Sequence, residues 1–177
     1  MTWRRLLICS ILTALAVPCR AEDDGLKLPQ LLFENGKLLK ESARSISGIF
    51  GGRKAKLNLA AERLQFLIKK YPKDANCAEA AYLIGEIYTD IQVKEYKKAV
   101  QYYLKSFEID PKVKPEVIYL AAEITDKKIK NAKEAARLYQ KVLDHSVIEK
   151  DRRKAMKRLE KLREIGFDGK PEETGQP

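Results

Sequence analysis

This chain of 177 residues has very few of the side chains on which metal and nucleophile chemistry depends. It contains one histidine, His145, and three cysteines, of which two lie within the first 21 residues. A zinc site needs several His or Cys ligands at short spacing, and the sequence holds no such group. The segment Gly51–Lys54 (GGRK) lacks the spacing and the hydroxyl of a phosphate-binding loop. The sequence therefore predicts no metal, no cofactor and no enzymatic activity.

Long apolar runs are also missing. The longest, Leu6–Val17, has 12 residues, whereas a helix that crosses a bilayer takes about 20. Two arginines precede it, and small residues follow at Cys19 and Ala21, which is typical of a secretory signal. We expect residues 1–21 to be removed after Ala21 and the protein to be exported, as a periplasmic or secreted product. An uncleaved anchor is one alternative; lipidation at Cys19 is another, disfavoured because Pro18 stands where lipoproteins carry a small residue.

The remaining cysteine, Cys77, has no partner within the mature chain, so no internal disulfide is expected. Cys77 opens a helical pattern and is interpreted as a small buried residue. A reactive thiol or an intermolecular disulfide is the alternative.

Acidic residues are fewer than basic ones, which gives a formal net charge of +10. Loss of the three arginines in residues 1–21 leaves +7, that is 10 minus 3. Eight Lys or Arg residues lie between Lys150 and Arg163. Such a helix suits an anionic membrane or cell-wall surface, although a charged outer face is also what a terminal capping helix needs. Export disfavours nucleic acid as a partner.

Apolar residues recur at helical spacing along most of the chain, and no stretch keeps the strict alternation of a strand. We expect seven helices and no strand. The predicted organisation is a loose segment 22–27, a helical domain 28–165 and a disordered tail 166–177. The domain is divided into a divergent helix pair 28–72, repeats 75–111 and 115–145, and a capping helix 148–165.

The apolar stripes predict which residues face the core. In the first helix they are Leu31, Leu32, Leu38, Leu39, Ala43 and Ile46. In the second, over 53–71, they are Leu57, Ala60, Ala61, Leu64, Leu67 and Ile68. In the last they are Ala155, Met156, Leu159, Leu162 and Ile165.

A short phrase occurs twice, as Tyr82–Ile87 (YLIGEI) and, 37 residues later, as Tyr119–Ile124 (YLAAEI). A helical segment that recurs at this period indicates stacked two-helix units. Gly85 lies mid-helix, where glycine costs about 1 kcal/mol relative to alanine. We expect another helix to approach closely there, with Ala99 facing Gly85.

These positions resemble a tetratricopeptide repeat, whose pattern combines small residues, aromatics and a closing proline. The matching residues are Gly85, Tyr88, Ala99, Tyr103 and Pro111 in the first copy and Ala122, Thr125, Ala135 and Tyr139 in the second, which lacks the proline. The stretch from Tyr71 to Tyr88 is similar to repeats of exported bacterial envelope proteins, among them outer-membrane assembly lipoproteins and coordinators of envelope division. The resemblance implies a short right-handed superhelix of antiparallel helix pairs that binds another protein.

In that family the first helix of each pair lines the concave face. The repeated residues there make Glu79, Tyr82, Glu86, Tyr119 and Glu123 the candidate protein-binding residues, with Glu116 as the counterpart of Glu79. They are expected to form an acidic, aromatic groove for a basic or extended peptide. The alternative is that the tyrosines fill the seam between units and the glutamates face solvent. The sequence thus predicts a non-enzymatic exported adaptor or scaffold. A peripheral membrane or cell-wall binder that uses the basic last helix is the second hypothesis, and a small enzyme built on helical hairpins, whose activity a single carboxylate substitution would abolish, is the third.

Overall fold

The computed structural model describes residues 28–44 and 52–167. The predicted signal segment 1–21, the segment 22–27, Ile46 and most of the predicted tail lie outside these ranges. Within them the chain is all-α, with seven α-helices, one π-helical turn and no strand. The elements are α1 (Leu28–Arg44), α3 (Arg53–Lys70), α4 (Cys77–Thr89), α5 (Tyr96–Ile109), α6 (Val117–Ile124), the π-helical η1 (Thr125–Ile129), α7 (Ala132–His145) and α8 (Glu149–Glu164).

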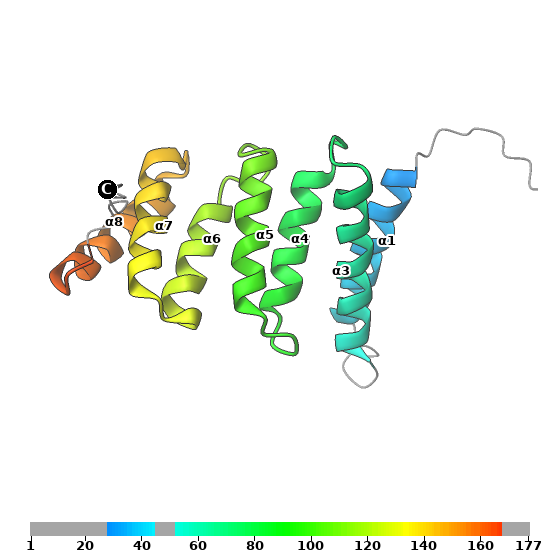
Figure 1. Cartoon of the computed structure of the whole chain (residues 1–177), viewed down its shortest axis with the longest axis horizontal. Coiled ribbons are helices and arrows are strands. Elements are labelled where there is room, and N and C mark those ends of the chain that lie inside the picture. The colour runs from blue at the N-terminus through cyan, green and yellow to red at the C-terminus, as the bar shows by residue number, and fades with distance from the viewer. Residues whose placement is uncertain (1–27, 45–51, 168–177) are drawn as a thin grey trace, which may run out of the picture.

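The helices stand in a row in which the chain runs up and down (Figure 1). Each helix packs chiefly against the helices before and after it in the sequence, and α1 also touches α4. Contacts that skip one helix place α1, α4, α6 and α8 in one layer and α3, α5 and α7 in the other. One continuous apolar core runs between the two layers.

The predicted inward stripe of α3 is confirmed, because all six of its residues are buried. The stripes of the two terminal helices are partly wrong. Leu31 and Leu38 on α1 are 48% and 62% exposed, and Met156 and Ile165 at the other end are 49% and 64% exposed. Among the described helices, α1 and α8 stand at the ends of the row, and the other described helices leave these four side chains uncovered.

Helix ends follow local chemistry. Tyr71 leaves helical geometry (φ −129°, ψ 59°) because it precedes Pro72, which disfavours that geometry. Asn131 caps α7, its side chain accepting a hydrogen bond from the backbone N–H of Glu134 at 3.2 Å.

Cys77 is fully buried at the start of α4, as its interpretation as a small core residue requires, and burial raises the pKa of its thiol.

Gly85 is a point of close approach, and the nearest group on the neighbouring helix is an aromatic ring. A methyl group added at Gly85 would lie 2.6 Å from the ring of Tyr103, which is itself buried. Ala99 is also fully buried, one turn before Tyr103 on α5. The glycine therefore makes room for the ring of Tyr103.

Two buried or half-buried carboxylates hold the turns that follow α4 and α6. Asp90 accepts a 2.6 Å hydrogen bond from Arg53 of α3. Burial opposes ionisation of Asp90, but the hydrogen bond and charge of Arg53 outweigh it, so its pKa lies below the ordinary value. Asp126, in η1, accepts two hydrogen bonds from Arg158 of α8, at 2.5 and 2.8 Å, and one from the hydroxyl of Tyr139 at 3.2 Å. These pairs fix how neighbouring units are joined.

Candidate functional site

The two tyrosines of the repeated phrase have equivalent surroundings. Tyr82 on α4 is half-buried, with its ring 5.9 Å from that of Tyr103 and the ammonium of Lys114 5.0 Å from its centre. Tyr119 on α6 lies 6.2 Å from the ring of Tyr139, also with a lysine over it. Each ring thus packs at the seam between helices and keeps one face toward a cation, a favourable arrangement for an aromatic ring.

The lysines that cover these rings come from the next unit of the chain. Lys114 precedes α6, and Lys154 lies on α8, 5.2 Å from the centre of Tyr119. Neither was found from the sequence, because the two occupy different positions relative to their tyrosines and leave no repeated signal.

Negative charge surrounds both tyrosines. Burial, followed by the charges of Glu86 and Glu116, raises the pKa of Tyr82 to about 12. Burial and the charge of Glu123 raise the pKa of Tyr119. Glu116, which precedes α6, therefore lies near Tyr82 of the preceding unit, as Glu86 does.

The predicted glutamates differ in the ion pairs that they form. Glu86 is held by α1, where Lys40 donates to it at 2.5 Å and Arg44 lies at 3.9 Å. Glu123 pairs with Lys127, one turn further along. Glu79 is half-buried in the first turn of α4 and makes no ion pair with any described residue. The sequence did not indicate that α1 would neutralise Glu86.

Asp151 extends the acidic surface to α8, a contribution that sequence reasoning missed. It is 8% exposed and forms no hydrogen bond or ion pair through its side chain within the described part of the chain. Burial is the main reason that its pKa is raised; the charge of Lys154 opposes the effect, and the charge of Glu116 adds to it. The first turn of a helix favours a carboxylate, but burial prevails here. We call the residues Glu79, Tyr82, Glu86, Glu116, Tyr119, Glu123 and Asp151 the tyrosine face.

We expect Asp151→Asn to stabilise the protein at pH 7 but not at pH 3. The raised pKa means that the carboxylate ionises less readily in the folded chain than in the unfolded chain, where it titrates near about 3.9. Folding therefore carries a penalty that is absent below the unfolded pKa and complete above the folded pKa. Urea unfolding at the two pH values measures it. The exposed Glu160→Gln on the same helix is the control, and an equal gain for Asp151→Asn at both pH values would contradict a charge effect.

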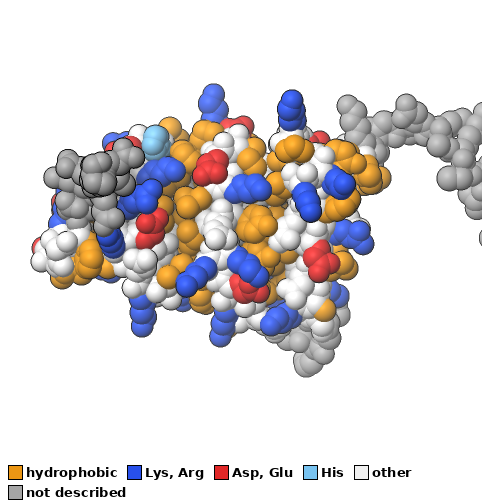
Figure 2. All heavy atoms as spheres, viewed as in Figure 1, with side chains coloured by type: hydrophobic (Ala, Val, Ile, Leu, Met, Phe, Trp, Pro, Cys, Tyr) orange, Lys and Arg blue, Asp and Glu red, His pale blue; other side chains and the backbone are white. Residues whose placement is uncertain are grey.

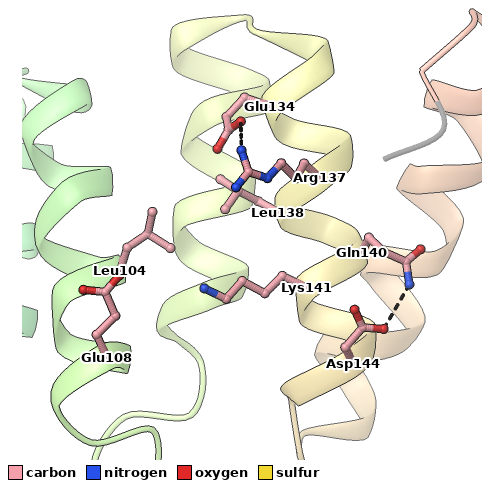
Figure 3. Close-up of a pocket in the computed structure, with 8 residues that line it drawn as sticks. All are labelled: Leu104, Glu108, Glu134, Arg137, Leu138, Gln140, Lys141 and Asp144. Atoms are coloured by element: carbon pink, nitrogen blue, oxygen red, sulfur yellow. Dashed lines mark hydrogen bonds and ion pairs between the residues drawn. The ribbon is translucent and has the colours of Figure 1, made fainter. Parts of the chain in front are cut away.

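The opposite layer carries a hollow of about 330 Å³ between α5 and α7 (Figure 3). Leu104 and Leu138 supply its apolar part, and Lys141 reaches across it toward α5. Its rim is internally paired: Glu134 contacts Arg137 at 3.6 Å, and Gln140 donates to Asp144 at 3.1 Å. Most of the polar groups around this hollow therefore already have partners within α7.

No group of His, Cys, Asp and Glu in residues 28–44 and 52–167 is arranged to hold a metal ion. Within the same ranges, no helix has the length and hydropathy needed to span a membrane. The described residues form an all-α protein of consecutive helices, with one face on which tyrosines, carboxylates and lysines lie together. No family model, curated protein or solved structure matches the chain.

Proposed function

We propose that this chain is an exported, tetratricopeptide-like adaptor that binds another protein along its tyrosine face. The observation that carries the proposal is the repetition of one surface unit on α4 and α6, a half-buried tyrosine set among carboxylates, in a row of helices that pack on their neighbours. In this proposal the row curves as a short right-handed superhelix, and α1, α4, α6 and α8 line its concave side.

The chemistry of the tyrosine face favours a partner segment with basic side chains. Its rings already accept cations, since Lys114 and Lys154 of the chain itself cover them. Both lysines are on flexible stems, and a Lys or Arg of the partner can replace them over the ring. Glu79 and Glu116 are half-buried, have no ion pair within the described residues and are available to such a group. Export rests on the amino-terminal pattern of arginines, apolar run and small residues.

Site-specific photo-crosslinking tests the proposal. A photoreactive amino acid replaces Glu79 or Glu116 on the tyrosine face, and in control chains it replaces Glu62 or Glu108, which are exposed on α3 and α5 of the other layer. In intact host cells the first two positions are expected to capture the same protein, and the controls to capture none of it. Equal capture from both layers would contradict the proposed face.

The second hypothesis, a membrane surface formed by the basic α8, receives less support. Five of the eight basic residues contact other parts of the chain or their own helix: Lys154 covers Tyr119, Arg158 binds Asp126, Arg152 donates to the carbonyl of Ser146, Arg153 pairs with Glu149 and Arg163 donates to Gln140. Much of the charge of α8 thus serves packing within the protein.

A further inference from the structure

Several lysines lie together on a different surface. The turn between α4 and α5 meets η1 at one edge of the molecule, which we call the lysine edge, and encloses a hollow of about 430 Å³ there. Lys94, Lys97, Lys98 and Lys128 line the hollow together with Tyr96, Ile129 and Glu95. Figure 1 places these turns at the lower edge of the molecule, where Lys and Arg side chains project in Figure 2, as they also do at the upper edge.

The acidic residues at this edge do not cancel its charge, because other groups already neutralise them. Asp90 is bound by Arg53, and Asp126 by Arg158. Glu95, the one carboxylate in the lining of the hollow, contacts Lys98 at 2.5 Å.

The other lysines of the edge remain unpaired. Lys94, Lys97, Lys128 and Lys130 make no ion pair with any residue in the described ranges. A cluster of unneutralised lysines produces a positive field at the edge.

Two of these lysines have a backbone conformation that residues other than glycine rarely adopt. Lys94 has φ 54° and Lys130 has φ 59°, at equivalent positions just before α5 and α7. Glycine or asparagine is the usual residue in this left-handed region, because a Cβ atom is strained there. A lysine therefore stands at both positions, where the backbone conformation favours a glycine. Strain of this kind is an indication of function.

We propose that the lysine edge binds the anionic headgroups of a phospholipid membrane. The lysines are spread along the edge from one turn to the next, as binding to a charged plane requires. Ile91, in the same turn as Lys94, is 71% exposed. An apolar side chain among lysines can enter the headgroup region while the ammonium groups bind phosphate. This role is independent of the tyrosine face.

Vesicle binding tests the inference. The full chain is sedimented with vesicles of phosphatidylcholine alone and of phosphatidylcholine mixed with phosphatidylglycerol, and the difference isolates the part of binding that depends on headgroup charge. The test variant combines Lys94→Glu, Lys97→Glu and Lys128→Glu. The control combines Lys70→Glu, Lys73→Glu and Lys112→Glu, three exposed lysines near the turns at the opposite ends of the helices, with the same change in charge.

The charge-dependent partition coefficient of the test variant should fall at least about tenfold, because each lysine at an anionic surface contributes separately. That of the control should fall much less. Ile91→Ser should weaken partitioning without a change in charge. Equal losses for both triple variants would overturn the inference. So would binding of a soluble acidic peptide or of inorganic phosphate at the lysine edge without retention on vesicles.

A second pair of substitutions separates function from folding. Lys94→Gly with Lys130→Gly relieves the backbone strain, so the Tm should rise or stay level while partitioning onto the anionic vesicles falls. Unchanged partitioning would show that these two lysines do not contact the membrane.

Discussion

Asp126→Ala is expected to lower the free energy of unfolding by about 3 kcal/mol, because it breaks a buried polar network. The carboxylate is 5% exposed and joins three elements, since Arg158 of α8 and Tyr139 of α7 both donate to it. Without it, the hydroxyl of the buried Tyr139 loses its acceptor, whereas Arg158, whose side chain is 43% exposed, can turn to water. Most of the lost stability therefore comes from the buried Tyr139 hydroxyl, which has no acceptor, and from the lost contact between η1 and α8.

Glu123→Ala is the matched control. Glu123 also pairs with a cation, but its partner Lys127 is 60% exposed, and surface pairs contribute about 0–1 kcal/mol. Urea unfolding of both variants at neutral pH gives the comparison. Equal losses would mean that the Asp126 network does not hold η1 to α8.

Gly85→Ala is expected to destabilise the protein by about 2 kcal/mol, although alanine is the better helix former. The new methyl group would lie 2.6 Å from the ring of Tyr103, which is 3% exposed and cannot move into solvent. Overpacking should therefore exceed the gain of about 1 kcal/mol in helix propensity.

A double-mutant cycle with Tyr103→Leu checks the cause. In the Tyr103→Leu background, where the ring is gone, Gly85→Ala should be neutral or stabilising, and the two substitutions should show a coupling energy of more than about 1 kcal/mol. If the effects of the two substitutions are additive, the destabilisation by Gly85→Ala does not arise from contact with the Tyr103 ring.

Helical periodicity predicted most of the fold, because it depends on each segment alone. The helix expected over 53–71 is observed at Arg53–Lys70, and that over 148–165 at Glu149–Glu164. Burial was predicted correctly where a helix has neighbours on both sides, as in α3. It was wrong at Leu38 and Met156, since the sequence does not show where the row of helices ends.

The candidate site was predictable only in part. The repeat located Tyr82 and Tyr119, and the structure gives them matching environments. Lys154 and Asp151, whose charges act on Tyr119, come from a helix outside the repeated phrase. Their roles depend on how units stack, which no local pattern encodes.

The most direct test of the account is a chemical-shift map of the isotopically labelled chain, titrated with the partner captured by crosslinking. The account predicts that the shifted amides cluster on α4, α6 and the start of α8, around Tyr82, Tyr119 and Asp151. A cluster around Leu104 and Lys141, in the hollow between α5 and α7, with α4 and α6 unchanged, would contradict it.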